Sequence, residues 1–136
     1  MAATHPPQHA YPGRPIDLQP ERASSATATT FPLVKEDAFE AIRMVLRKDH
    51  EMAGHQVDGP ITVYCLDGQI AFTARGQTHH LRAGHWLFLL GNEPHSLRAI
   101  EDSSFLLTIL FPRSSSECQA QAMSPAPGRP IYPHLS

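Results

Sequence analysis

Glycine residues recur at an almost constant interval through the middle of this chain of 136 residues. They occupy positions 59, 68, 76, 84 and 91, and short apolar stretches lie between them. Short strands joined by turns at roughly 8–12-residue spacing are typical of an all-β sandwich or barrel. No helical pattern interrupts the series, which excludes a parallel sheet built from βαβ units. The spacing therefore predicts a single antiparallel β-barrel.

The folded unit is expected over residues 31–111, between two tails. Residues 1–30 are rich in Pro, Ala, Ser and Thr and have almost no apolar periodicity, which predicts a flexible segment. The alternative is a short arm that lies across a neighbouring subunit through its few apolar residues, Tyr11, Ile16 and Leu18. Residues 112–136 are rich in proline and are interpreted as a second flexible tail.

Two segments at the start of the folded unit carry strand patterns. Phe31–Asp37 is predicted to be an edge strand, because Pro32 cannot donate a hydrogen bond to a second neighbour. In the next segment apolar residues alternate with Arg43 and Arg47, as in a strand with one buried face. Residues 39–43 could instead begin a helix, but the strand-like sequence that follows favours a strand.

The dipeptide Asp67-Gly68 is one of those favoured in a two-residue type I′ turn. We therefore expect the strands on either side of it to form a hairpin in which Cys65 faces Ile70. In this register six apolar residues share one face, which we place inside the barrel: Ile61, Val63, Cys65, Ile70, Phe72 and Ala74. Tyr64 and Leu66 lie on the opposite face and, with Trp86, predict a contact surface for a homodimer.

The segment from Gly84 to His95 contains an apolar strand, a second turn and a histidine. It resembles the second sequence motif of the cupin family, G-x5-P-x-G-x2-H-x3-N, whose histidine is a metal ligand. Gly84 and His95 match this motif, while Leu90, Asn92 and Ala99 replace its proline, glycine and asparagine. His85, directly after the glycine, is expected to make a hydrogen bond at the turn.

The stretch before Gly68 resembles the first cupin motif, G-x5-H-x-H-x3–4-E-x6-G. His55 takes the place of the first histidine, whereas Val57 and Ile61 stand where the second histidine and the glutamate would be. The resemblance is to the small single-domain cupins of bacteria. It implies a jelly-roll barrel in which His55 and His95 are the two retained metal ligands of four.

A third metal ligand could come from outside the two motifs. If Arg75-Gly76 closes a tight hairpin, His79 opposes Phe72 and shares the inner face of the barrel. Firm sites for zinc, iron, nickel or manganese need at least three protein ligands. The cofactor is therefore a loosely held divalent ion or none, and His55 and His95 could equally be pocket histidines that bond to hydroxyls and water. The rest of the pocket lining is expected from Val57, Ile61, Val63, Cys65 and Phe72.

Composition narrows the classes of partner. A balance of 13 acidic against 11 basic residues argues against binding to nucleic acid. No apolar stretch is long enough to span a membrane, and the N-terminus lacks the pattern of a signal peptide. Cys65 and Cys118 lie in unlike settings, which favours reduced thiols and a cytoplasmic location.

Three functions are consistent with these features. The first is a binding module whose barrel takes a small polar ligand, with or without a loosely held metal. The second is a metal-dependent cupin enzyme, such as a dioxygenase, an isomerase or a sugar-modifying enzyme. The third is a structural or regulatory subunit. No acid–base pair is evident beside the histidines, so the binding module is preferred and whether the chain is an enzyme stays open.

Overall fold

The structure is a computed structural model that describes residues 9–18, 22–55 and 57–112, with the backbone alone for residues 53–55. These ranges contain strands and turns and no helix. The strands are β1 (Phe31–Lys35), β2 (Phe39–Leu46), β3 (Glu51–His55), β4 (Ile61–Asp67), β5 (Gln69–Ala74), β6 (Gln77–Arg82), β7 (Trp86–Leu89), β8 (His95–Ala99) and β9 (Ser103–Leu110).

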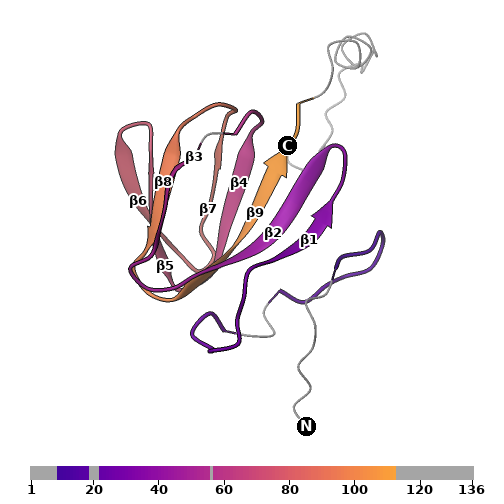
Figure 1. Cartoon of the computed structure of the whole chain (residues 1–136), viewed down its shortest axis with the longest axis horizontal. Helices are drawn as coiled ribbons and strands as arrows, with labels where there is room; N and C mark the ends of the chain where they lie inside the picture. Colours follow the sequence, from indigo (N-terminus) through magenta and orange to yellow (C-terminus); the bar gives the residue numbers. More distant parts are fainter. Residues whose placement is uncertain (1–8, 19–21, 56, 113–136) are drawn as a thin grey trace, which may run out of the picture.

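The strands form two antiparallel sheets that face each other (Figure 1). One sheet has the order β1-β2-β9-β4-β7 and the other has the order β3-β8-β5-β6. After β2 the chain passes repeatedly from one sheet to the other, which is the jelly-roll arrangement. The predicted antiparallel all-β fold is therefore confirmed. β6 and β7 follow each other in sequence but form free edges of different sheets.

The first two strands form where the sequence patterns place them. β1 is one of the two edge strands of the five-stranded sheet, as Pro32 predicts. Residues 39–46 form a strand and not a helix, and β2 pairs with β9 along its whole length. Met44 and Leu46 pack against the core as expected, but the prediction of a single buried face is wrong, because Arg43 is buried as well, with 3% of its surface exposed.

The predicted hairpin around Asp67-Gly68 is wrong. β4 pairs with β7 and β9, whereas β5 pairs with β6 and β8, so the dipeptide is a corner at which the chain changes sheets. A type I′ turn needs positive φ at both residues, and only Gly68 has it, at 85°. A Cβ atom at Gly68 would meet the carbonyl oxygen of Asp102 and the hydroxyl of Ser103. The glycine thus serves a close approach between the corner and the start of β9.

The expected alternation of faces holds despite the different pairing. All six residues predicted to face inward are buried, and they form the centre of the core with Leu81, Leu89, Leu97 and Phe105. Leu66 departs from the prediction, because only 7% of its surface is exposed and it is not part of an outer contact face. The ladder between β4 and β9 slips between Cys65 and Asp67, and this bulge ends the regular alternation there.

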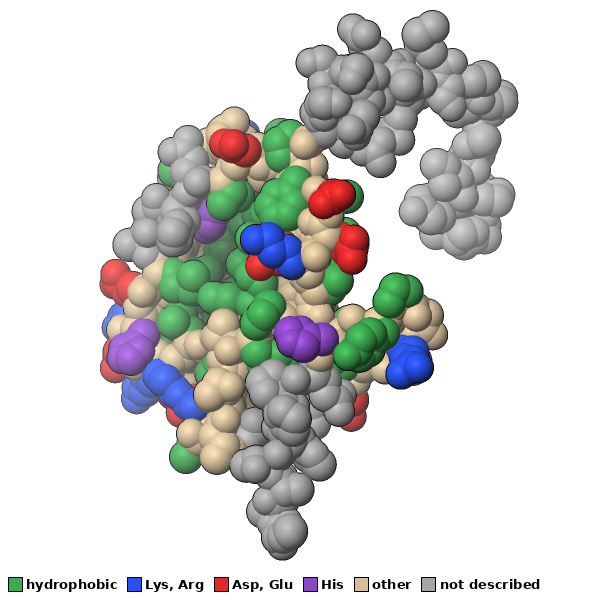
Figure 2. All heavy atoms as spheres, turned by 45° about the vertical axis from the view of Figure 1, so that its right-hand side comes forward, with side chains coloured by type: hydrophobic (Ala, Val, Ile, Leu, Met, Phe, Trp, Pro, Cys, Tyr) green, Lys and Arg blue, Asp and Glu red, His purple; other side chains and the backbone are tan. Residues whose placement is uncertain are grey.

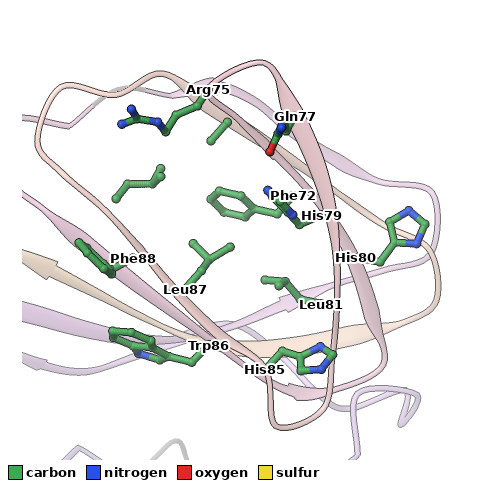
Figure 3. Close-up of a pocket in the computed structure, with 12 residues that line it drawn as sticks. Phe72, Arg75, Gln77, His79, His80, Leu81, His85, Trp86, Leu87 and Phe88 are labelled. Atoms are coloured by element: carbon green, nitrogen blue, oxygen red, sulfur yellow. The ribbon is translucent and has the colours of Figure 1, made fainter.

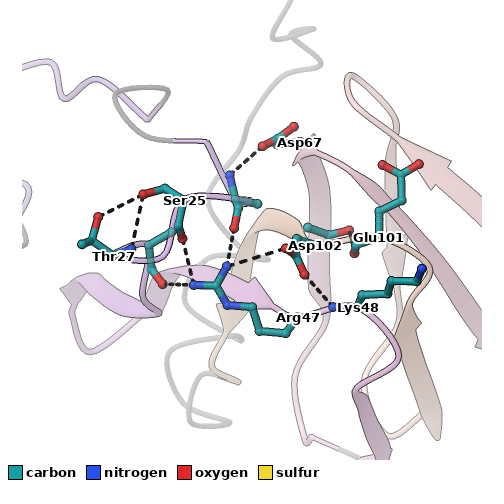
Figure 4. A network of polar contacts seen from close by, with 10 residues as sticks. Ser25, Thr27, Arg47, Lys48, Asp67, Glu101 and Asp102 are labelled. Carbon is teal, nitrogen blue, oxygen red and sulfur yellow. Dashed lines mark hydrogen bonds and ion pairs between the residues drawn. The ribbon is translucent and has the colours of Figure 1, made fainter.

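Residues 22–30 pack against the sheets through Arg47, the residue after β2 (Figure 4). Its guanidinium group donates hydrogen bonds to three backbone carbonyls, those of Ala23 at 2.6 Å, Ser25 at 3.0 Å and Ala28 at 2.8 Å. The amide of Ala23 donates to Asp67 Oδ2 at 2.7 Å, and Ala23 is fully buried. The prediction of a flexible segment over residues 1–30 did not anticipate these contacts of residues 23–28.

Charged side chains are dispersed over the visible face of the molecule in Figure 2. Acidic and basic groups alternate there with areas of hydrophobic side chains, and neither sign forms a continuous field. Within the described ranges there is no helix that is long and apolar enough to cross a membrane.

Candidate functional site

A cavity of about 610 Å³ opens between the two free edge strands, β6 and β7 (Figure 3). Its apolar floor reaches the core and includes Phe72, Leu81, Leu87 and Leu89. Its polar rim includes Arg75, Gln77, His79 and His85. An apolar cavity with a few polar groups at its edge is the usual form of a small-molecule site.

The β5–β6 hairpin decides which side chains face the cavity. Arg75 and Gly76 both have positive φ, 53° and 76°, and close the two-residue turn expected from the sequence. The predicted pairing of His79 with Phe72 is confirmed, and Figure 3 shows His79 beside Phe72 while His80 points away. His79 is nevertheless exposed, because β6 is an edge strand with open space on its inner side.

All ionisable side chains that line this cavity, among the described residues, are basic: Arg75, His79, His80 and His85. His85 accepts a hydrogen bond at Nδ1 from the amide of Arg82 at 3.0 Å, which confirms its expected role at the turn. Nδ1 of His85 is then an acceptor, so the proton of the neutral ring lies on Nε2. The cavity therefore offers hydrogen-bond donors and a positive charge, but no carboxylate.

A second hollow, of about 470 Å³, adjoins the first and shares Ala74 and Arg75 with it. His95 lines this hollow at the start of β8. Its ring stacks on Phe72, with centroids 5.6 Å apart, and its Nδ1 lies 3.1 Å from the carbonyl oxygen of Glu93. Because a carbonyl can only accept, Nδ1 of His95 is the donor, and Nε2 of the neutral imidazole keeps its lone pair.

Arg75 lies between the two hollows in a conformation that is unfavourable for its type. A left-handed backbone costs a residue with a Cβ atom about 1–2 kcal/mol. Its Nη1 donates to Glu93 Oε1 at 2.8 Å, but 70% of the Arg75 side chain is exposed. Glu93 is only 18% exposed, so this hydrogen bond between charged groups offsets part of the cost.

The two predicted histidine ligands are brought together at the level of the backbone. β3 and β8 are neighbours, and His55 pairs directly with His95 in their register. The side chain of His55 lies outside what the structure describes. His79, the candidate third ligand, is on β6, and β5 separates it from His95 on β8.

The remaining predicted pocket residues lie in or against the core. Ile61, Val63 and Cys65 are buried within it, Val57 packs against it, and Phe72 also forms part of the cavity floor. Burial raises the pKa of the Cys65 thiol from 9.0 to about 11. A thiol in this state is protonated at neutral pH and is a poor nucleophile and a poor metal ligand.

The described residues do not supply a metal site with three ligands. No group of three or more His, Cys, Asp or Glu side chains with described positions lies close enough to hold an ion. His55 and His95 alone would supply two imidazoles, fewer than firm divalent sites have.

Several cavity residues were not expected from the sequence, namely Gln77, Leu81, Leu87 and Arg75 as a rim residue. They follow from the two free edge strands β6 and β7, and nothing in the sequence of these two strands shows that they are edges. One local signal was present, because an Arg-Gly pair at a two-residue turn places a long basic side chain where Asn or Gly is usual.

Residues 46–118 match the protein family described as the AraC-like ligand binding domain. No curated protein sequence matches the chain. Among solved structures, a conserved protein of unknown function from Streptococcus pyogenes is similar at 25% identity, covering 62% of this chain and 75% of that one, with a TM-score of 0.59. A cupin superfamily protein from Desulfitobacterium hafniense is similar at 16% identity, covering 74% and 93%, with a TM-score of 0.63. An RmlC-like cupin with a double-stranded β-helix fold from Methanocaldococcus jannaschii is similar at 16% identity, covering 66% and 85%, with a TM-score of 0.58.

Proposed function

This chain belongs to the family of AraC-like ligand-binding domains, and on that premise we propose that it is a binding module for a small polar molecule. The observation that carries the proposal is the cavity between β6 and β7, of about 610 Å³. It has the size of a small-molecule site, an apolar floor continuous with the core and a polar rim.

We propose that His55 and His95 form a polar end of the ligand site. The backbone register, in which His55 on β3 pairs with His95 on β8, supports a shared site for the two imidazoles. The contact of His95 with Phe72 connects this end to the floor of the cavity. A divalent ion held by the two imidazoles alone would be bound loosely.

The binding module is preferred over a metal-dependent cupin enzyme because of the donor set. Such enzymes need a metal held by three or more side chains, and β5 lies between His79 and His95. The cavity rim has no carboxylate, among described residues, to act as a general base beside the ligand.

We also propose that the protein forms a homodimer through the outer face of the five-stranded sheet. Tyr64 and Trp86 are paired across β4 and β7 and are 38% and 56% exposed. Phe88 and Leu90 continue this exposed apolar surface, at 56% and 60%. Exposed apolar surface of this kind is typical of subunit contacts. Sedimentation equilibrium is expected to show a dimer that Trp86→Lys converts to a monomer.

The ligand proposal is tested by titrating isotope-labelled protein, without an affinity tag, with a set of small polar and aromatic compounds. Ligands are expected to shift the amide resonances of β6 and β7 residues around the cavity. His79→Ala should weaken binding, since this side chain faces the cavity. His50→Ala is the matched control, since this exposed histidine precedes β3 and does not line the cavity. Binding that maps to another surface, or that changes equally in both variants, would contradict the proposal.

A further inference from the structure

We propose that Arg75 is the residue that binds the ligand's charged group, and that the ligand is an organic acid with an apolar body. This inference rests on the proposed binding function and assigns the chemistry of its ligand. Three observations carry it: the charge of the cavity lining, the backbone and partner of Arg75, and the composition of the floor.

The lining favours an anion over a cation. Arg75, His79 and His85 contribute donors at the rim, and no described residue of the lining carries a negative charge. Because Nδ1 of His85 accepts the amide of Arg82, its remaining ring N–H is free to donate. A bound cation would meet these donors without a partner for its charge, whereas a carboxylate would accept from several of them.

Arg75 is held in position at the mouth of the cavity. Glu93 accepts from Arg75 Nη1 through one oxygen and from the amide of Leu90 through the other, both at 2.8 Å. The carboxylate of Glu93 thus connects the β5–β6 turn to the loop after β7. Within the described part of the chain only Nη1 of Arg75 has a partner. Its Nε and Nη2 atoms stay available to a ligand, and two parallel hydrogen bonds from a guanidinium group fit a carboxylate.

The left-handed backbone of Arg75 supports a role in binding. Strained backbone is a recognised mark of functional positions. Asparagine at this position would give the Asn-Gly pair that type I′ turns favour, yet the chain carries an arginine with φ of 53°. The role of the side chain, and not the geometry of the turn, therefore explains why arginine occupies position 75.

The floor determines the rest of the ligand. Phe72, Leu81 and Leu87 offer aromatic and aliphatic carbon at the centre of the cavity (Figure 3). A small, fully polar anion would leave this surface in contact with water. An aromatic or branched aliphatic carboxylate would cover it while its acid group reaches the rim.

The test compares two probes of nearly equal shape, 4-phenylbutanoate and 4-phenylbutanamide, by calorimetric titration and amide chemical shifts. The wild-type protein is expected to bind the acid at least about tenfold more tightly than the amide, since a hydrogen bond between charged groups is among the strong ones. Arg75→Asn should reduce this preference to about twofold or less while the melting temperature changes little, because asparagine suits the turn but loses the hydrogen bond to Glu93. Arg75→Lys should keep only part of the preference for the acid, since an ammonium group lacks the two parallel N–H donors of a guanidinium group.

The outcomes of this test distinguish a failure of the inference about Arg75 and the organic acid from a failure of the proposed binding function. Equal binding of acid and amide would overturn the inference about the acid and leave the binding cavity intact. A preference that survives in Arg75→Asn would overturn the role of Arg75. If neither probe binds or shifts the resonances of the cavity residues, both the ligand class and the cavity as a binding site are contradicted.

Discussion

The imidazole of His95 lies almost parallel to the ring of Phe72, with the two planes inclined by 8° and the centroids 5.6 Å apart. Phe72 is fully buried, so the core itself determines the orientation of this histidine. The carbonyl of Glu93 takes the proton of Nδ1. The imidazole is thus supported from two sides, and Nε2 is the atom left for a ligand or an ion.

This arrangement predicts how the protein responds to divalent metal. Calorimetric titration of tag-free protein with zinc is expected to show weak binding, because His55 and His95 are two ligands where firm sites have at least three. His95→Ala and His55→Ala should each abolish this binding while the melting temperature changes little. His80→Ala, on the outer side of β6, is the control. Metal uptake that persists in both variants would show that the two histidines do not form a shared site.

The contacts of Arg47 predict that residues 22–28 are part of the cooperative fold. Arg47→Ala removes hydrogen bonds to three carbonyls and is expected to lower the free energy of unfolding by about 2 kcal/mol. Arg47→Lys should not restore it, because one ammonium group cannot reproduce the planar fork. Urea denaturation measures the loss, and amide hydrogen exchange should locate it in residues 22–28.

Arg98 provides the matched control for this prediction. Its ion pair with Asp49 is exposed on both sides, at 52% and 61%, so Arg98→Ala should cost less than about 1 kcal/mol. Equal losses in the Arg47 and Arg98 variants would mean that residues 22–28 add nothing to the stability of the fold.

The local patterns of the sequence predicted most of the buried side chains and one of the two tight turns correctly. The period of two in residues 61–67 and 69–74 identified the buried side chains, because alternation depends only on the strand itself. The two-residue turn considered for Arg75-Gly76 does form, because the strands on either side of it remain in one sheet. The pairing of His79 with Phe72 followed directly from that turn.

The partner strands of β4 and β5 could not be predicted, because the choice of partners depends on residues far along the chain. Asp67-Gly68 indicates that the chain bends, but not whether it stays in the same sheet. The hydroxyl of Ser103, 34 residues after Gln69, bonds to both the amide and the carbonyl of Gln69 and holds the corner. The cavity between β6 and β7 was missed for the same reason, since it results from the separation of the two sheets.

Cys65 predicts a loss of stability at alkaline pH. Burial raises its pKa from 9.0 to about 11, so the folded state holds its proton where the unfolded state has released it. The stabilisation from the neutral thiol is complete below pH 9 and is lost as pH rises toward 11. The difference corresponds to about 3 kcal/mol at most. Urea denaturation of a Cys118→Ser background should show this decline, and Cys65→Ala in that background should not. A native thiol that reacts rapidly at pH 8 would contradict the burial of Cys65.

Gly68 and Gly76 allow the cost of the corner between sheets to be separated from the cost of positive φ. Both have φ near 80°, at 85° and 76°, but a Cβ atom at Gly76 would meet nothing within 4 Å. Gly76→Ala should therefore lower the free energy of unfolding only by the cost of a left-handed backbone at alanine, about 1–2 kcal/mol. Gly68→Ala should lose more, by roughly 2 kcal/mol or greater, because the new methyl group collides with the backbone of Asp102 and with Ser103. Thermal and urea unfolding of the two variants measure the difference. Equal destabilisation would show that β4 and β5 do not meet the start of β9 at this corner.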